Sequence, residues 1–585
     1  MFQLLSPVAL FLIVFAATAL HGDASEPTPA VSTLSGQVRG TVRSAPAISN
    51  KPVFTFLGIP FAAPPVGDLR FRPTEPVVPW EGVMDATEFG PSCPQDLVRV
   101  RRIYDFIPFT LPHEIVSEDC LVLNIMTTSL DSSAALPVMV WIHGGSLVSG
   151  TGALYNFTAL VAHQDVVVVT VNYRLGAFGF LSTGDDNAPG NYAFMDQVEA
   201  LRWIKSNIWS FGGDPDCVTI FGESAGGLSV SYLVLSPLAN GLFHRAISQS
   251  GTALTTPTTA NPLAAATAQA EEVGCDHQDV KAMMSCLRQK PFQDIVDSAS
   301  QVARKIGAFG ASAFNPVVDE HFLLDPPLVS LQKGEFTTVP YLLGVNNHEF
   351  GYLLSSLILG DFGNGMSRDV CAAIVKRVLS LSAQTDTIDQ TVTAMLEEYR
   401  DPTNAPDDPM AVQMMLTQIL GDFVFLVPTV AVADNHAAQG GRVYLYENHH
   451  RPGTSTKPAW VGCDHADDLV IMTGMPYLGE DGPTYPSKPL SFSEEDRELS
   501  LDMMAYWANF ARTGNPSDFT GSPSVKPNLT LWPSYTPDNP AYLKLAVTSS
   551  AEVGLKANHV RFWYDILFNK PTSDATKDTT GKEEL

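Results

Sequence analysis

Three apolar runs with little polar interruption stand out in the first half of the chain. They are "LPVMVWIHGG" (136–145), "DVVVVTVNYRLG" (165–176) and "PDCVTIFGESAGG" (215–227). A half-exposed strand would alternate apolar and polar residues, so these runs predict strands covered on both faces, as in a parallel sheet. Between the second and third, residues 191–215 have apolar positions at helical spacing and a glycine stop. This order predicts a strand, a right-handed helical crossover and a strand.

The same pattern continues toward the C-terminus. Residues 338–351 and 441–450 each predict a strand that leads into a polar loop, and 494–516 predict a long amphipathic helix closed by glycine. The regions from about 255 to 320 and from about 366 to 435 are poorer in strand signals, so we expect helical insertions above the sheet. No internal repeat and no Pro/Gly/Ser-rich linker divides the sequence. The simplest architecture is one α/β unit, residues 25–568, built on one sheet.

Charge and the N-terminal sequence narrow the class of protein. A net charge of −27 argues against a nucleic-acid partner, because phosphate binding needs clustered lysine and arginine. Residues 1–24 hold an uncharged apolar stretch followed by small residues, which predicts a secretory signal peptide cleaved near 17–19 or 22–24. No other segment approaches the ~18 uncharged apolar residues of a membrane helix, so we expect a soluble mature protein.

The C-terminal tail, residues 569–585, ends in "KEEL". This sequence differs by one conservative step from K-D-E-L, which a retrieval receptor of the endoplasmic reticulum reads. Together with a signal peptide it predicts retention in the lumen of the endoplasmic reticulum, with secretion as the alternative. Asn156 and Asn528 are the acceptors of the two N-x-[ST] sequences, and each is a glycosylation site or an unmodified loop asparagine.

The chain has seven cysteines, which this route would expose to oxidising conditions. We expect the pairs Cys93–Cys120 and Cys275–Cys286, since each closes a modest loop between polar or turn-rich flanks, although sequence alone does not fix connectivity. The odd count leaves at least one free thiol. No C-x-x-C pair is present, so we expect no metal site. The remaining cysteines are Cys217, Cys371 and Cys463.

The stretch "FGESAGG" (221–227) is a candidate nucleophile turn. Ser224 lies in a G-x-S-x-G pattern directly after a predicted strand and before an apolar, helix-like run. A sharp strand-to-helix turn that lifts a serine off a sheet leaves no room for side chains two residues away, which explains Gly222 and Gly226. The pentapeptide alone recurs by chance, but at a strand end it indicates a nucleophilic serine.

Attack by a serine on an ester creates an oxyanion that needs preorganised donors. "WIHGGSL" places Gly144 and Gly145 at the end of an upstream strand, where bare N–H groups can approach a carbonyl. Paired glycines also serve simply to turn a chain. The amide of Ala225, directly after the serine, would be a third donor.

A hydrolase of this kind needs the chain order serine, acid, histidine, which excludes every histidine before Ser224. Downstream, His465 lies in a polar loop, "VGCDHADDLVI", ahead of an apolar run. Glu349 follows a predicted strand and lies between the two, as the acid should. The rivals are His449 and His450 for the base, and Asp319 and Glu320 for the acid.

Longer segments around these residues carry a family resemblance. They are "FLGIPFAAPPVGDLRF", "SEDCLVLNI", "PVMVWIHGG", "VTIFGESAGG", "ISQSG", "GVNNHEFG", "DHADDL" and "YWANFARTGNP". The chain resembles the type-B carboxylesterases of the cholinesterase-like α/β-hydrolase superfamily, and most of all the vertebrate liver-type enzymes, from about residue 36 to 565. The resemblance implies an α/β-hydrolase fold, with a large twisted, mostly parallel sheet flanked by helices and with helical insertions over the active site.

The resemblance also implies an activity and a set of roles. It implies hydrolysis of esters, and also of amides and thioesters, of small lipophilic or xenobiotic compounds through an acyl-serine, with no cofactor. "KEEL" stands where liver-type relatives carry an H-x-E-L type signal. Cys463 and Asp468, a position where relatives often have Glu, depart from the family pattern without removing a catalytic group. The implied roles are nucleophile for Ser224, acid for Glu349, base for His465 and oxyanion donors for Gly144, Gly145 and Ala225, and the resemblance supports the disulfides Cys93–Cys120 and Cys275–Cys286.

Three other functions occur within this superfamily. A cholinesterase is disfavoured because the segment 93–120 has no tryptophan to hold a cationic choline. A non-catalytic adhesion protein is disfavoured because the chain keeps all three triad residues. A bile-salt-stimulated lipase is disfavoured because Pro-rich C-terminal repeats are absent from the sequence.

Overall fold

The computed structural model describes residues 27–567, except 105, 108, 110, 309–312, 361–362, 383–387, 479–489 and 524–528. The predicted signal peptide, the polar tail with its KEEL terminus, and Asn528 lie outside the described residues.

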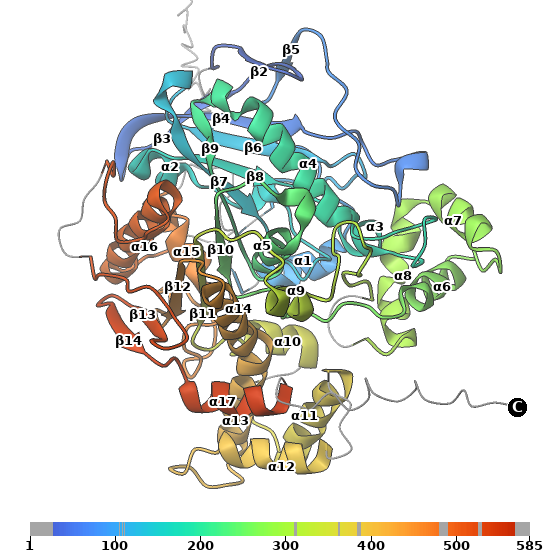
Figure 1. Ribbon diagram of the computed structural model, residues 1–585, viewed down its shortest axis with the longest axis vertical. Coiled ribbons are helices and arrows are strands. Elements are labelled where there is room, and N and C mark those ends of the chain that lie inside the picture. Colours follow the sequence, from blue (N-terminus) through green and yellow to red (C-terminus); the bar gives the residue numbers. More distant parts are fainter. Residues whose placement is uncertain are drawn as a thin grey trace, which may run out of the picture.

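An 11-stranded sheet forms the centre of the molecule (Figure 1). Its strand order is β14-β13-β12-β11-β10-β9-β7-β8-β6-β4-β3. The sheet is parallel from β13 to β8, as the apolar runs predicted, and antiparallel at both margins, which the sequence patterns did not predict. The parallel strands are β7 (Leu136–Ile142), β8 (Val167–Val171), β9 (Gly213–Glu223), β10 (Arg245–Gln249), β11 (Tyr341–Asn346), β12 (Val443–Asn448) and β13 (Ala541–Leu545). The antiparallel strands are β3 (Thr41–Ala45), β4 (Ser49–Pro60), β6 (Val122–Thr127) and β14 (Ser550–Val553), and a small separate sheet holds β1 (Val31–Thr33), β2 (Gly36–Arg39) and β5 (Val83–Asp85).

Helices connect the strands and make up both expected insertions. Within 255–320 and 366–435, the described residues contain helices and no strand, which confirms that expectation. The helices up to β11 are α1 (Leu97–Tyr104), α2 (Thr158–Gln164), α3 (Gly176–Phe180), α4 (Tyr192–Asn207), α5 (Ala225–Leu235), α6 (Pro262–Glu272), α7 (Val280–Gln289), α8 (Phe292–Lys305) and α9 (Pro327–Lys333). The later ones are α10 (Leu353–Leu359), α11 (Arg368–Ser382), α12 (Ile388–Glu398), α13 (Pro409–Gly421), the π-helical turn η6 (Asp422–Leu426), α14 (Val427–Ala438), α15 (Asp467–Met472), α16 (Glu494–Thr513) and α17 (Ala557–Leu567).

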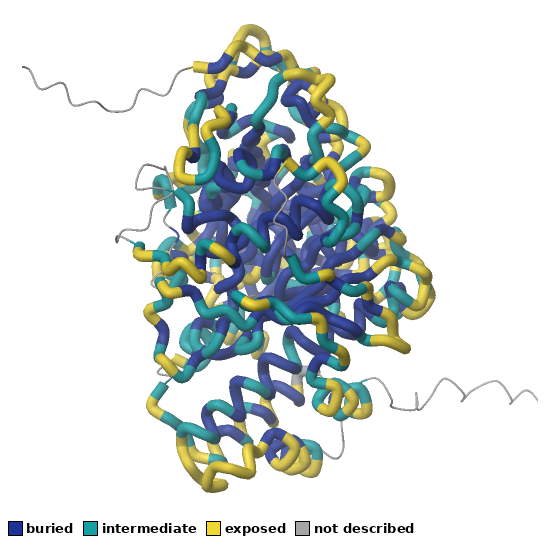
Figure 2. The backbone as a smooth tube through the Cα atoms, turned by 90° about the vertical axis from the view of Figure 1, so that its left-hand side faces the viewer, coloured by how far each residue is buried: buried dark blue, intermediate teal, exposed yellow. Residues whose placement is uncertain are grey.

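Alternate residues of the central strands face two separate apolar cores. In β7, Val138 and Val140 pack in one core with residues of α4 and α5, whereas Met139 and Trp141 pack in the other with residues of α2 and α16. Figure 1 shows α4 and α16 on opposite sides of the sheet, and Figure 2 shows buried residues running through the centre of the molecule. Both faces of β7 are therefore covered, which is why its sequence is continuously apolar.

The α13–η6–α14 segment, Pro409–Ala438, is the one described stretch long and apolar enough to cross a membrane. Asp422 interrupts the apolar run, so the sequence pattern did not predict a membrane helix here. In its most apolar window, 83% of the residues are buried inside the protein. Packing against the core accounts for their apolar character.

The parallel strands end in register at one edge of the sheet. Ile142 at the end of β7 pairs with Gly222 of β9, and Glu223 at the end of β9 pairs with Gln249 of β10. In open α/β sheets this edge is where ligands bind, because the loops that follow the strands converge there. The loops after β7, β9, β11 and β12 are the ones that carry the candidate residues.

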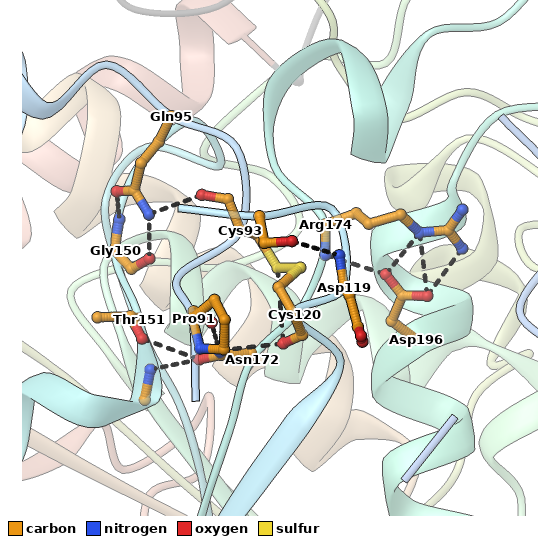
Figure 3. The surroundings of a disulfide bond; sticks show 12 residues. Pro91, Cys93, Gln95, Asp119, Cys120, Gly150, Thr151, Asn172, Arg174 and Asp196 are labelled. Carbon is orange, nitrogen blue, oxygen red and sulfur yellow. Dashed lines mark hydrogen bonds and ion pairs between the residues drawn. A yellow bond between two sulfur atoms is a disulfide. The ribbon is translucent and has the colours of Figure 1, made fainter. Parts of the chain in front are cut away.

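A buried ion pair fixes the start of the crossover helix α4 beside the segment that follows β8 (Figure 3). The Arg174 and Asp196 side chains are 3% and 0% exposed, and Nη2 of the arginine lies 2.7 Å from Oδ1 of the aspartate. Nε of Arg174 also donates to Oδ2 of Asp196 at 2.8 Å, so the carboxylate is bound in a bidentate manner. Such a pair depends on both partners, because either charge alone would be costly to bury.

We predict that Asp196→Ala lowers the free energy of unfolding by about 3–5 kcal/mol, because it leaves the Arg174 charge buried without a counter-charge. Urea denaturation measures the change. As a control, Asp85→Ala removes an exposed pair with Arg39, whose side chains are 62% and 46% exposed, and should cost about 0–1 kcal/mol. Equal losses in the two variants would contradict the prediction.

Candidate active site

Ser224 stands at the junction of β9 and α5 in a strained backbone conformation. Its φ is +57° and its ψ is −123°, which a residue with a side chain rarely adopts. The Ser224 amide donates to the carbonyl of Gln249 at 2.8 Å, and the Ser224 carbonyl accepts from the amide of Leu228 at 2.9 Å. These bonds hold the turn between β10 and the first turn of α5.

The glycines of this turn are required by close backbone contacts. A methyl group on Gly226 would lie 2.0 Å from the carbonyl oxygen of Ile142, and one on Gly222 would lie 2.5 Å from the same atom. A methyl group on Gly251 would lie 2.2 Å from the carbonyl oxygen of Ser224. The backbones of β7, β9 and β10 therefore pack against one another without side chains, and this packing supports the strain at Ser224.

Gly144 and Gly145 lie beside the serine. A methyl group on Gly144 would be 3.2 Å from Cβ of Ser224, and Gly145 has a φ of +115°, a value that glycine adopts readily. Neither amide of the two donates to any residue that the structure describes. Ala225 is the first residue of α5, where backbone N–H groups lack an intrahelical acceptor. All three predicted donors thus lie around one serine with their N–H groups available.

His465 and Glu349 form a short, buried contact. Nδ1 of His465 lies 2.6 Å from Oε2 of Glu349, and both side chains are less than 5% exposed. The other oxygen of Glu349 accepts from the hydroxyl of Ser250 at 2.5 Å and from the amide of Asn346 at 2.6 Å. The carboxylate is therefore fixed on both oxygens, and it in turn orients the imidazole.

The second nitrogen of the imidazole faces another carboxyl group. Nε2 of His465 has no hydrogen-bond partner among the described residues, and it lies 3.2 Å from Oε1 of Glu223, the residue before Ser224. The Phe425 ring from η6 packs on the imidazole with centroids 4.8 Å apart. Nε2 is thus buried beside the carboxyl group of Glu223, at the end of β9.

Burial and charge shift the pKa values of this pair in coupled ways. Burial raises the pKa of Glu223 to about 8, opposed by His465. Burial lowers the pKa of His465, but Glu223 and Glu349 outweigh it and raise the value to about 9. The two pKa values depend on each other, because Glu223 raises the pKa of His465 only while Glu223 is charged. Burial favours neutral Glu223 at neutral pH, which leaves Glu349 as the main group that stabilises the imidazolium.

The rival histidines lie elsewhere. Nε2 of His449 lies 2.5 Å from Glu447, and Nε2 of His450 lies 2.7 Å from Asp496. His143, which precedes the serine, is buried, stacks on a tyrosine ring and has its pKa lowered by burial to about 4. Of these histidines, the structure brings only His465 to a carboxylate beside the nucleophile turn.

Of the rival acids, Asp319 stabilises its own loop by hydrogen bonds and Glu320 points to solvent. Oδ1 of Asp319 accepts from three consecutive backbone amides, and Oδ2 accepts from Asn191 at 3.0 Å. Glu320 is exposed. Neither is hydrogen-bonded to His465, whereas Glu349 is.

The loop closed by Cys93 and Cys120 lies beside Gly150, which follows Gly144 and Gly145 in the same segment (Figure 3). The Gln95 side chain binds both backbone groups of Gly150, accepting at 2.8 Å and donating at 2.9 Å. Asn172 donates to the carbonyl of Cys120 at 3.1 Å. The Gln95 bonds anchor the loop, which contains α1, to the segment that follows Gly144 and Gly145, and the Asn172 bond anchors it to the segment that follows β8.

The second disulfide joins Cys275 to Cys286, and the pairing agrees with the expectation for both bridges. Cys217, Cys371 and Cys463 are free. Asn156 is partly buried, and its side-chain oxygen accepts from the amide of Thr158 at 2.9 Å. Among the described residues, no cluster of three or more His, Cys, Asp or Glu side chains could hold a metal ion.

Sequence reasoning missed two residues that bind Glu349. Ser250 and Asn346 bind Glu349, and Asn346 also donates to the buried Asp468 at 3.3 Å. Ser250 has a φ of +50°, and it follows the short strand β10, whose polar ending gave little strand signal. A search for polar residues directly after every short apolar run would have found it.

A mostly parallel sheet with a strained serine after its central strand, and a buried histidine–carboxylate pair across the adjacent strand ends, defines an α/β-hydrolase. A family model described as "Carboxylesterase family" matches residues 27–563. The chain belongs to the carboxylesterase family and is a carboxylic ester hydrolase.

Curated relatives match over nearly the whole chain. Carboxylesterase 1C of Mus musculus is 38% identical over 95% of this chain and 96% of its own length. Liver carboxylesterase of Sus scrofa is 39% identical over 96% of this chain and 97% of its own length. A medium-chain fatty acyl-CoA hydrolase precursor of Anas platyrhynchos is 40% identical over 92% of both chains.

We predict that Gly226→Ala slows the reaction of Ser224 with a fluorophosphonate by about 10²-fold, because the methyl group must displace the Ile142 carbonyl and with it the serine. Stopped-flow or gel-based labelling measures the rate constant. Gly241→Ala is the control: its methyl group meets no atom within 4 Å, but its φ of +73° should cost about 1–2 kcal/mol of stability without slowing labelling. Equal labelling rates in the two variants would refute the steric account.

Proposed function

We propose that Ser224, His465 and Glu349 carry out ester hydrolysis as nucleophile, base and acid. His465 takes the hydroxyl proton of Ser224 as its oxygen attacks the acyl carbon, and Glu349 orients the imidazole and stabilises its charged form. His465 then gives the proton to the leaving alcohol, and an acyl-serine remains. Water activated by the same imidazole releases the acid and restores the hydroxyl.

The N–H groups of Gly144, Gly145 and Ala225 would stabilise the oxyanion of each tetrahedral intermediate. Removing one such donor in a serine hydrolase costs about 10²–10³-fold in kcat. The absence of a described acceptor for the amides of Gly144 and Gly145, beside a strained nucleophile, supports this assignment.

The observation that carries the proposal is the buried contact of 2.6 Å between Nδ1 of His465 and Glu349, with Nε2 left without a hydrogen-bond partner among the described residues. This arrangement fixes one tautomer, in which Nδ1 carries a proton and Nε2 can accept one. It requires no metal or organic cofactor for any step.

We propose esters of small lipophilic or xenobiotic compounds as the substrates, with thioesters included. The relatives named carboxylesterases favour the esters. The relative from Anas platyrhynchos, which is named a fatty acyl-CoA hydrolase, favours the thioesters. A choline ester is not favoured, because the segment 93–120 offers no tryptophan to a quaternary ammonium.

We predict that Ser224→Ala lowers kcat for a 4-nitrophenyl ester by about 10⁶-fold, and that Glu349→Gln lowers it by about 10⁴-fold. Glu349→Gln should also move the acid limb of kcat/KM to lower pH. The base works only when neutral, so activity is lost as pH falls through the pKa of His465, and removing the Glu349 charge lowers that pKa.

The matched control is Asp319→Asn, which changes a rival acid outside the site and should leave kcat unchanged. Full activity in Ser224→Ala would contradict the role of Ser224 as nucleophile, and full activity in Glu349→Gln would contradict the role of Glu349 as acid. Turnover of acetylcholine comparable to that of simple aryl esters would favour the cholinesterase alternative.

We propose further that the protein enters the secretory route and is retained in the lumen of the endoplasmic reticulum. The apolar residues 1–24, the two disulfides and the terminal KEEL support this. The retrieval receptor would be the partner, and Asn156 and Asn528 would be open to glycosylation along this route.

We predict that deleting the last four residues, 582–585, moves most of the protein from cells to medium, because the retrieval receptor no longer binds it. Immunoblotting of cell and medium fractions measures the distribution. Replacing KEEL by KDEL should keep the protein in cells. Retention of the deleted form at the level of the full chain would contradict the prediction.

A further inference from the structure

A lysine is buried in the loop that carries His465. The Lys457 side chain is 1% exposed, and its Nζ lies 2.7 Å from Oδ1 of Asp467 and 3.1 Å from Oδ2 of Asp464. The two aspartate side chains are 8% and 0% exposed. An isolated charge is unstable in such a setting, so the ammonium and the carboxylates depend on one another.

The two aspartates lie on either side of the histidine in the sequence, and each accepts hydrogen bonds from backbone amides. Oδ2 of Asp467 accepts from the amide of Asp464 at 2.8 Å, which closes a short loop around residue 465. The oxygens of Asp464 accept from the amides of Tyr352 at 3.2 Å and Leu353 at 2.9 Å. Tyr352 and Leu353 come shortly after Glu349, so one ion cluster joins the histidine loop to the segment of the triad acid.

The backbone of the lysine is itself fixed. The Arg451 guanidinium donates to the carbonyls of Lys457 at 2.6 Å, Pro458 at 2.8 Å and Val461 at 2.8 Å. The backbone of Lys457 is therefore held in place, and the ammonium group in turn fixes the positions of Asp464 and Asp467.

We infer that Lys457 is a positioning residue for the hydrolysis proposed above: by pairing with Asp464 and Asp467, it sets the place of the His465 imidazole relative to Ser224. The inference rests on the proposed function. Lys457 contacts none of the reacting atoms and acts only through the loop.

The lysine also balances charge near the imidazole. Burial lowers the pKa of Lys457, but Asp467 and Asp464 outweigh it and raise the value. Removing the lysine leaves Asp464 uncompensated, and Asp464 raises the pKa of His465. The titratable groups that face the imidazole are Glu223 at the end of β9, Glu349 after β11, Asp464 in its own loop and Asp468 of α15.

The test is Lys457→Met, which shortens the unbranched side chain by only one atom and removes its charge. We expect kcat for a 4-nitrophenyl ester to fall by about 10²-fold with KM unchanged, because the base is misplaced while the substrate path is not touched. We also expect the acid limb of kcat/KM to move to higher pH, because the uncompensated aspartate favours the imidazolium. Thermal unfolding confirms that the variant is folded.

A second variant keeps the inference testable if Lys457→Met does not fold. Asp467→Asn removes one negative charge instead of the positive one, so the acid limb should move to lower pH, opposite to the lysine variant. Lys333→Met is the matched control: this lysine also lies near two carboxylates, at 2.6 Å from Asp325 and 3.9 Å from Glu335, but its side chain is 48% exposed. It should leave kcat and the pH profile unchanged.

The outcomes separate the two claims. Unchanged kcat and pH limb in a folded Lys457→Met, with Ser224→Ala inactive in the same assay, overturn the positioning role and leave the proposed function intact. A loss of stability with no change in kcat or in the pH limb makes Lys457 a structural ion pair only, and so overturns it as well. Activity in Ser224→Ala overturns the proposed function itself.

Discussion

The proposed active site depends on one close approach of backbones at the end of β9. Ser224 has a strained conformation that costs about 1–3 kcal/mol and persists only where the surroundings enforce it. The strands on both sides supply that enforcement, because the glycines at 222, 226 and 251 let three backbones meet at distances that exclude any Cβ atom. The two cores on the faces of the sheet hold these strands in register, so much of the fold serves to maintain one turn.

The second constraint is the burial of charge around the histidine. Carboxyl groups of Glu223, Glu349 and Asp468 lie near one imidazole, where water cannot screen them. A buried carboxyl group is stable when it is hydrogen-bonded, neutral or paired with a positive charge. In the loop that carries His465, Lys457 supplies that positive charge to Asp464 and Asp467. The proton balance of the site is therefore a property of the group of residues and not of the triad alone.

The parts of this structure that the sequence predicts are those with a local pattern. The strands β7, β8, β9, β11 and β12 are short apolar runs covered on both faces. Ser224 lies in a G-x-S-x-G pattern, whose glycines are those that a sharp strand-to-helix turn requires. His465 and Glu349 could be ranked only by chain order, because their contact joins positions 116 residues apart. The antiparallel margins, α1 inside the Cys93–Cys120 loop, and the partners Ser250 and Asn346 were not predicted. They depend on long-range packing, which leaves no periodic trace in one sequence.

The most direct test of the account is to identify the atom that reacts. The intact protein is inhibited with a fluorophosphonate, digested and mapped by mass spectrometry. We predict one adduct per chain, on Ser224, and none when the chain is unfolded before labelling, because the reactivity comes from the strained turn and the buried imidazole. Complete inhibition with the adduct on another residue, or equal labelling of the unfolded chain, would contradict it.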